Sequence, residues 1–427
     1  MFGENSIYEG IKLIAPSRYL MLDEGGAKLG GFSRFYAQER RSLSEADGSA
    51  AADAIFKQAR CFAELPVSDY QMDLTGGMDS RAVLAIALQS GLMNKVSSLK
   101  TYGPEGMPEF EVTSELARIF NLPHENVNTK TAGNASPEDH WRRLRYNAMA
   151  LDGAVSADTG MPGPMKTSFP CLSGTGGELF RPHIRSRRDL RLTSVDGLNA
   201  MVENYQRTMD PLGVHGEGVT EALRKTMRDI ARHYVSQGVP FDDVHYLFYA
   251  EHRLPWWAGY ALSNLMGRRR LFPLVNKEAA RIVYSGSPEL KKMDWLHFML
   301  MKQADPRLIQ IPFYENTWDA RLKGYSGGLP MADRPFPIKS ATPTLSTGSW
   351  MTEFAEAEWD RLFDYVLSSP SSQIFQFVDR ARLEQRWGER KWASRLASAS
   401  ALLSLVSFRM VEANDMLPAK QGVPLAC

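Results

Sequence analysis

The segment DYQMDLTGGMDSRAVLAIAL, residues 69–88, decides the fold of this chain. Its first part alternates between polar and apolar residues, as half-buried β-strands do, and its last part is an almost unbroken run of small apolar residues. Two glycines and an Asp-Ser pair separate the two parts. The pattern therefore predicts a strand at 70–74, a sharp turn, and a helix at 80–90.

The residues of this turn suit the binding of phosphate. Gly76 and Gly77 let backbone N–H groups approach an anion without a Cβ in the way, and a helix start presents such groups with the positive end of its dipole. Thr75 and Ser80 add hydroxyl groups, and Asp79 can hold the Mg²⁺ ion that accompanies a nucleotide. The turn contains no lysine, unlike a Walker A loop. Taken alone, it also fits a plain helix cap.

The chain around the turn alternates between helix and strand patterns. We expect helices at 49–64, 80–90 and 109–121, and strands at 70–74, 96–102 and 169–172. Such alternation is typical of an α/β protein with a doubly wound parallel sheet, which binds ligands where strands end and helices begin. Beyond residue 195, amphipathic stretches predict helices at 196–208, 219–236, 242–265, 277–285, 351–368 and 394–413. A hairpin is expected at Glu24–Gly26 and a long mobile loop at 325–348.

The composition of the 427-residue chain, with 44% hydrophobic and 23% charged residues, is that of a soluble globular protein. The 50 basic and 49 acidic side chains leave a net charge of +1, which gives no general attraction to nucleic acid or anionic membranes. The three scattered cysteines, Cys61, Cys171 and Cys427, argue against a disulfide framework and a zinc knuckle. The sequence shows neither a signal-peptide pattern nor a run of roughly 20 apolar residues that could span a bilayer. We therefore expect a cytoplasmic protein.

Several motifs, taken in order along the chain, resemble those of the asparagine synthetase superfamily. These enzymes are ATP pyrophosphatases of the N type, and they include β-lactam synthetase and lasso peptide macrolactam synthetase. LTGGMDS (74–80) resembles their pyrophosphate loop, LSGTGGELF (172–180) their second glycine motif, and RLKGYSGG (321–328) the loop of their active-site lysine. LKTYG with its following helix resembles the second nucleotide-binding strand, and LFPLVN resembles the Arg-x-Pro-Phe-Leu-Asp-like segment. Several ordered motifs are stronger support than a single glycine loop.

The resemblance runs from Ser6 to about Gly328 and implies an adenine nucleotide alpha hydrolase-like fold with a helical C-terminal subdomain. It divides the chain into a remnant of a glutaminase-domain end or linker at 1–48, an ATP-pyrophosphatase core at 49–195, and a helical subdomain at 196–427. Relatives that hydrolyse glutamine begin with a catalytic cysteine after the initiator methionine, whereas this chain begins Met1-Phe2. We therefore expect no glutaminase activity, and nitrogen from free ammonia, a substrate amine or a partner chain.

The resemblance also implies the residues of an ATP site. The adenosine would be framed by Leu74, Tyr102, Ser173 and Gly174, and the pyrophosphate loop would consist of Thr75, Gly76, Gly77, Asp79 and Ser80. Asp79 and Glu178 would be the Mg²⁺ ligands, and Lys323 would contact the acyl-adenylate and the leaving pyrophosphate. The synthetases have an Asp-Glu pair where this chain has Gly177-Glu178, so one of the two acids is missing here. We expect Lys323, Asp79 and Glu178 to be the catalytic residues.

The function that this resemblance implies is an AMP-forming amide ligase. It would use ATP and Mg²⁺ to adenylate a small-molecule or peptide carboxylate and transfer it to an amine or ammonia, in natural-product or peptide biosynthesis. One alternative is an asparagine synthetase-type subunit that takes ammonia from a partner glutaminase, and another is a non-catalytic nucleotide-binding relative. A precursor peptide is a further candidate partner. A sulfur-inserting tRNA enzyme would require paired cysteines and a basic face, which the sequence does not show.

Three further features have a structural and a functional interpretation. The arginine-rich segment 181–191 is interpreted as an exposed face or loop, with anion binding as the alternative. The two tryptophans within 251–260 are interpreted as helix packing, while Glu251 and Arg253 could face the pocket. The histidines, His124 among them, show no metal-ligand spacing, so no metal other than nucleotide magnesium is expected.

Overall fold

The computed structural model describes residues 10–12, 14, 18–31, 39–103, 106–128, 136–151, 170–181, 197, 199–203, 210–255, 270–338 and 349–415. It contains a five-stranded sheet in the order β5-β4-β3-β6-β7, and all neighbouring strands are parallel. The strands are β3 (Tyr70–Asp73), β4 (Val96–Gly103), β5 (His124–Asn128), β6 (Cys171–Leu172) and β7 (Arg270–Leu271). The predicted α/β class and parallel sheet are confirmed.

The order of the strands creates a reversal at the middle of the sheet. The chain starts at β3, continues to β4 and β5 on one side, and then returns to β6 and β7 on the other side of β3. The reversal therefore lies between β3 and β6. In open parallel sheets, ligands bind at the carboxyl ends of the two strands that flank such a point. The two predicted glycine turns follow these two strands directly.

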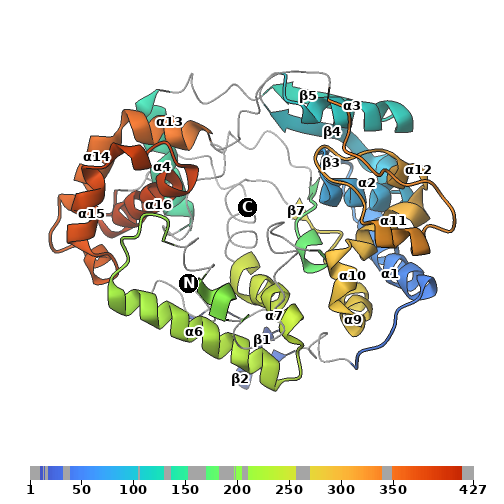
Figure 1. Ribbon diagram of the computed structural model, residues 1–427, viewed down its shortest axis with the longest axis horizontal. Coiled ribbons are helices and arrows are strands. Elements are labelled where there is room, and N and C mark those ends of the chain that lie inside the picture. The colour runs from blue at the N-terminus through green and yellow to red at the C-terminus, as the bar shows by residue number, and fades with distance from the viewer. Residues whose placement is uncertain are drawn as a thin grey trace.

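Helices α1 (Glu45–Glu64), α2 (Met78–Ser90) and α11 (Trp295–Ala304) pack against one another next to the sheet (Figure 1). Helix α1 begins with a capping box in which Ser44 and Asp47 bind each other's backbone N–H groups. Helix α2 is apolar on nearly all sides because it is buried between the sheet and the other two helices. Helix α3 (Glu109–Phe120) follows β4, as predicted.

A second, separate hydrophobic cluster is formed by helices from two distant parts of the chain. Helix α4 (Pro137–Leu151) packs there against α13 (Ser349–Ala357) and α16 (Leu396–Glu412). Helices α14 (Trp359–Leu367) and α15 (Arg380–Trp387) complete this cluster, which lies on the side away from the sheet (Figure 1). The single helix predicted at 351–368 is wrong, because α13 and α14 are separated at Glu358. The Glu358 carboxylate accepts hydrogen bonds from Trp141 (2.9 Å) and Arg361 (3.1 Å). Because Trp141 belongs to α4, this contact connects the interruption between α13 and α14 to α4.

The predicted helices at 219–236, 277–285 and 394–413 are confirmed as α6 (Glu217–Ser236), α9 (Lys277–Ser285) and α16. Only the first part of the stretch 242–265 is described, as α7 (Phe241–Phe248) continued by a π-helix at Tyr249–Arg253. The predicted hairpin is confirmed as β1 (Arg18–Asp23) paired with β2 (Gly26–Gly31). Short helical elements complete the described chain: η1 (Leu92–Lys95), η3 (Gly177–Leu179), α10 (Pro288–Lys292), α12 (Arg307–Gln310), η7 (Ala320–Tyr325), η8 (Gln373–Gln376) and η9 (Arg390–Trp392).

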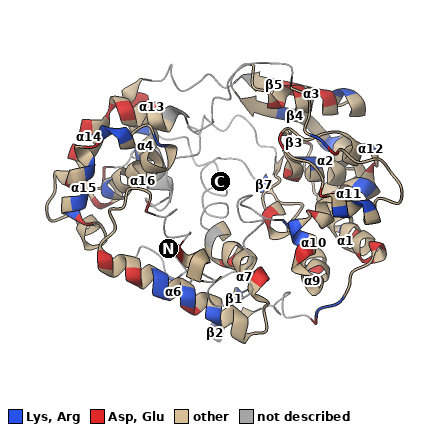
Figure 2. Cartoon of the chain, in the orientation of Figure 1, with Lys and Arg blue, Asp and Glu red and all other residues tan. Residues whose placement is uncertain are grey.

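Side chains of both charge signs are interspersed over the helices, in keeping with the net charge of +1 (Figure 2). Within the ranges that the structure describes, no helix has the length and apolar character needed to cross a bilayer. Most of the predicted helix 196–208, the two tryptophans of 251–260 and the second half of the predicted loop 325–348 lie outside the described residues. The described first part of that loop, 326–338, contains no regular helix or strand.

Candidate active site

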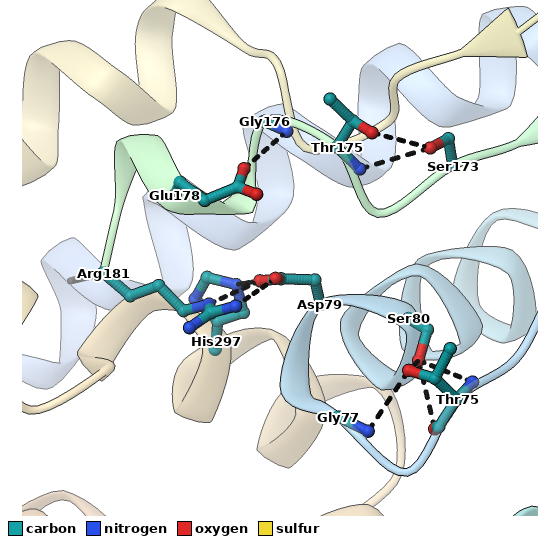
Figure 3. A network of polar contacts seen from close by, with 10 residues as sticks. All are labelled: Thr75, Gly77, Asp79, Ser80, Ser173, Thr175, Gly176, Glu178, Arg181 and His297. Carbon is teal, nitrogen blue, oxygen red and sulfur yellow. Dashed lines mark hydrogen bonds and ion pairs between the residues drawn. The ribbon is translucent and has the colours of Figure 1, made fainter. Parts of the chain in front are cut away.

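The first glycine turn connects β3 to α2 and is held by its own hydroxyl groups. The Ser80 hydroxyl accepts a hydrogen bond from the Thr75 N–H (3.0 Å) and lies 2.9 Å from the Thr75 hydroxyl. The Thr75 hydroxyl in turn accepts from the Gly77 N–H at 3.2 Å (Figure 3). These contacts fix the loop predicted to bind pyrophosphate in a tight turn at the start of a 13-residue helix. Such a helix start favours negative charge.

Gly76, the middle residue of this turn, contacts two segments that the sequence did not assign to the site. Its N–H donates to the Glu109 carboxylate at 3.2 Å, and its carbonyl accepts from the Tyr314 N–H at 3.2 Å. A Cβ at Gly76 would lie 2.7 Å from the Tyr314 Cβ, so only glycine fits there. The turn is thus enclosed by the start of α3 on one side and by the segment after α12 on the other.

The second glycine turn follows β6 and leads into η3. Gly176 has a φ angle of 99°, which favours glycine, and its N–H donates to the Glu178 carboxylate at 3.0 Å. The Ser173 hydroxyl lies 3.0 Å from the Thr175 hydroxyl and accepts from the Thr175 N–H (Figure 3). Leu74 and Ser173, predicted to frame the adenosine, therefore lie at the ends of neighbouring strands on the same edge of the sheet.

The two turns approach so closely that glycine is required between them. A Cβ at Gly174 would lie 2.9 Å from the Asp79 Cβ, and a Cβ at Gly177 would overlap the Asp79 carboxylate and lie 3.1 Å from His297 Nε2. Protein atoms do not pack at such distances without moving. The glycines of the second turn therefore serve to bring it against the start of α2, where Asp79 lies.

This close approach predicts the effect of a single methyl group. In Gly177→Ala, we expect the methyl group to displace the Asp79 side chain and to lower the free energy of unfolding by about 1–3 kcal/mol, as overpacking does. Urea unfolding would measure the change. Gly218→Ala is the matched control, because a Cβ there meets no atom within 4 Å, and its free energy of unfolding should be unchanged or slightly higher. A Gly177→Ala variant as stable as the natural protein would contradict the interlocked arrangement.

Asp79 is the centre of the site, and both of its carboxylate oxygens are engaged by positively charged or polar groups. Arg181 binds it with two nitrogens, Nε donating to Oδ1 at 2.7 Å and Nη2 to Oδ2. His297 Nε2 lies 2.9 Å from Oδ1 (Figure 3). Burial by itself would raise the pKa of Asp79, but the hydrogen bonds from Arg181 and His297 outweigh burial and hold the pKa well below its usual range. Asp79 is therefore ionised.

The interpretation of segment 181–191 as an exposed face or loop is wrong for its first residue, Arg181. Only 23% of its side chain is exposed, and its guanidinium group lies inside the site. Residues 182–191 are outside the described part of the chain. The functional alternative, that an arginine of this segment binds an anionic group of the substrate, stays a prediction, since the Arg181 guanidinium binds Asp79 in the structure. His297, on the buried helix α11, was not predicted at all.

The residues predicted to hold Mg²⁺ do not fit a metal ion as they are arranged here. Asp79 is engaged by Arg181 and His297, so a cation at its carboxylate would have to replace the guanidinium group. Burial and the charge of Asp79 raise the pKa of Glu178, which disfavours its ionised, metal-binding form. Among the described residues, no group of three or more His, Cys, Asp or Glu side chains is placed to bind a metal. Magnesium at Asp79 and Glu178 stays a prediction.

Lys323, the predicted catalytic lysine, lies in η7 and its side chain is exposed. Its neighbour Leu322 is buried in the main core, and Lys302 of α11 donates to the Tyr325 carbonyl at 2.6 Å. The ammonium group of Lys323 forms no ion pair within the described ranges. The structure thus attaches the lysine loop to α11, the helix that also carries His297, without joining Lys323 to either glycine turn.

The remaining candidates lie in strand β4, in the π-helix after α7 and in strand β5. Tyr102 is at the end of β4, next to β3 in the sheet. Glu251 lies in the π-helix after α7 and accepts a hydrogen bond from the Tyr234 hydroxyl at 2.7 Å, while burial lowers the pKa of the adjacent His252 to about 4. The side chain of Arg253 is outside the description. His124 Nε2 lies 2.8 Å from the Thr101 hydroxyl, which donates to the Leu74 carbonyl at 2.9 Å.

Comparison with known proteins adds no relative to this picture. No protein-family model matches the chain, and a search of curated proteins finds no match. The site is therefore defined by its geometry: two interlocked glycine turns at the reversal of a parallel sheet, with Asp79, Glu178, Arg181 and His297 between them.

Proposed function

We propose that the protein is an ATP-dependent, AMP-forming amide ligase. The observation that carries the proposal is the interlocking of two glycine turns at the strand ends that flank the reversal of the sheet. One turn opens helix α2 with Thr75, Gly76 and Gly77, and the other brings Arg181 to the same point. Backbone N–H groups, a helix start and a guanidinium group together suit a ligand with several phosphates.

The proposed reaction has two steps. A carboxylate oxygen of the substrate attacks the α-phosphorus of ATP, the bond to the β-phosphate oxygen breaks, and pyrophosphate leaves with the bonding electrons. The nitrogen of an amine or ammonia then attacks the acyl carbon, the bond to AMP breaks, and the nitrogen loses a proton to water or a base. The net products are an amide, AMP and pyrophosphate.

Negative charge grows on the departing pyrophosphate, and the chain offers groups that can stabilise this charge. The first turn provides backbone N–H groups and the Arg181 guanidinium provides a fixed positive charge, which its ion pair with Asp79 keeps in place. Lys323 would contribute its ammonium group when the loop 321–328 closes over the nucleotide. Leu74, Tyr102, Ser173 and Gly174 would surround the adenosine at the strand ends.

We also propose the chemical classes of the two substrates. The carboxylate donor would be a small molecule or a peptide, and the acceptor an amine, in a specialised biosynthetic pathway in the cytoplasm. In a variant of this function, a partner glutaminase would deliver ammonia and the product would be a primary amide, as in asparagine synthesis.

The stoichiometry of the nucleotide products tests the proposed class. With a carboxylate and amine that the protein accepts, we expect AMP and pyrophosphate in equal amounts, measured by ion-exchange chromatography and a coupled pyrophosphate assay. Boiled protein and reactions without the carboxylate are the controls. Formation of ADP and phosphate instead would place the enzyme in a different mechanistic class.

One observation favours a second candidate, a protein that binds a nucleotide without turning it over. Asp79 is held by Arg181 and His297 on both oxygens, an arrangement that needs no metal ion for its stability. Isothermal titration with ATP, together with a turnover assay on the same sample, separates the two candidates. Binding without formation of AMP over a broad panel of carboxylates and amines would favour the second.

A further inference from the structure

A backbone N–H group of the first glycine turn is already hydrogen-bonded to a carboxyl group of the protein itself. The Gly76 N–H donates to Oε1 of Glu109, a residue 33 positions further along the chain and the first residue of helix α3. The proposed function assigns the same N–H group to a phosphate oxygen. The Glu109 carboxylate therefore lies where the phosphate would have to bind.

The packing around Gly76 shows that this contact is built into the fold. A Cβ on Gly76 would lie 3.4 Å from both Cγ and Oε1 of Glu109 and 2.7 Å from the Tyr314 Cβ, so the turn is held between α3 and the segment of Tyr314. Burial raises the pKa of Glu109, the hydrogen bond from Gly76 lowers it, and the charge of Glu315 raises it again. The carboxylate thus lies in surroundings that disfavour its charge, and the Gly76 N–H partly offsets this.

We propose that Glu109 is an internal competitor for the phosphate groups of the ligand, which must displace its carboxylate from Gly76. This inference rests on the proposed nucleotide function. A group tethered to the same protein competes at an effective concentration on the order of millimolar. A small monoanion therefore displaces it poorly, whereas a polyphosphate brings more charge and reaches Arg181 as well.

The competition has two consequences for the ligand that the site accepts. It selects for di- and triphosphates over singly charged anions, because only the former gain enough contacts to replace the internal hydrogen bond. It also favours release of pyrophosphate, since the Glu109 carboxylate returns to Gly76 when the product leaves.

Titration calorimetry on the full chain with MgCl₂ tests the proposal, with ATP, inorganic pyrophosphate and adenosine as probes. In Glu109→Gln the uncharged amide competes less, so we expect ATP and pyrophosphate to bind about tenfold more tightly, as when a competing state of the protein is removed. Adenosine, which has no phosphate, should bind equally to both proteins. Glu115→Gln is the matched control, because it removes a charge from the same helix at a surface pair with Arg118 and should change no affinity.

The outcomes separate this inference from the proposed function. If the natural protein binds ATP and Glu109→Gln binds it no more tightly, the proposed competition by Glu109 is overturned, but the proposed nucleotide site is not. If both proteins are folded and neither binds ATP or pyrophosphate, the nucleotide function is overturned and the competitor with it. Should Glu109→Gln fail to fold, Glu109→Asp decides, because its shorter side chain withdraws from Gly76: tighter pyrophosphate binding supports the proposal and unchanged binding overturns it.

Discussion

In Lys323→Ala, kcat is expected to fall by about two or more orders of magnitude, while ATP binding weakens by less than about tenfold. The ammonium group would neutralise charge that grows only as pyrophosphate leaves, so its benefit belongs to the transition state. The Lys323 side chain is exposed in η7, and we expect it to reach the nucleotide when the glycine-rich loop 321–328 closes. Steady-state kinetics and ATP titration on the same variant measure the two quantities.

The exposed Lys57 of α1 provides a matched control, and Lys57→Ala should leave kcat unchanged. Protection of residues 321–330 from protease by ATP and substrate would support closure of the loop. A near-normal kcat in Lys323→Ala would show that another cation carries the role. Arg321 would be examined first, although it pairs with Asp319 (2.7 Å) and Glu289 (2.9 Å) in the structure.

In Asp79→Ala, formation of AMP and pyrophosphate is expected to be lost, a decrease of about three orders of magnitude or more. The substitution removes the carboxylate that fixes Arg181 and His297, and it leaves a largely buried guanidinium without that partner. Loss of one member of a buried ion pair costs up to about 3–5 kcal/mol, so the free energy of unfolding must be measured alongside activity.

Asp79→Asn keeps the shape of the side chain and separates the loss of charge from the loss of packing. We expect it to be more stable than Asp79→Ala and equally inactive. Asp53→Asn is the control, since Asp53 is exposed and its carboxylate binds only Gln303 within the described residues. An active and folded Asp79→Asn variant would contradict a catalytic role for the carboxylate.

The depressed pKa of Asp79 also sets the direction of a pH effect on stability. Because the folded-state pKa lies below the unfolded value of about 4, the stabilisation by Asp79 is complete above that pH and is lost as the pH falls further. The stability difference between the natural protein and Asp79→Asn should therefore be constant at neutral pH and shrink in acid.

The parallel sheet and both glycine turns could be predicted because their signals are local. Alternation over a few residues marks β3 and β4, and glycines mark the turns. Helix α11 has no such signal, since it is buried on nearly all sides and its apolar residues show no periodicity. Its His297 could not be assigned to the site for the same reason.

The partners of Asp79 and Gly76 escaped prediction because they come from distant parts of the chain. Arg181 and His297 are 102 and 218 residues from Asp79, and nothing in the spacing of these residues shows that they meet. Glu109 fits the sequence pattern of a first-turn helix acid, and only the fold shows that its carboxylate reaches Gly76.

The interlocked turns have a consequence for how the protein folds. The first turn is made from one short segment, but Asp79 meets Arg181 only after β6 has paired with β3 across about a hundred residues of chain. Parallel pairing over such a separation is slow, because the loop must close before its contacts form. Ligand binding should therefore appear late in refolding, after the helical signal has recovered, and a stopped-flow experiment that follows both signals would show the delay.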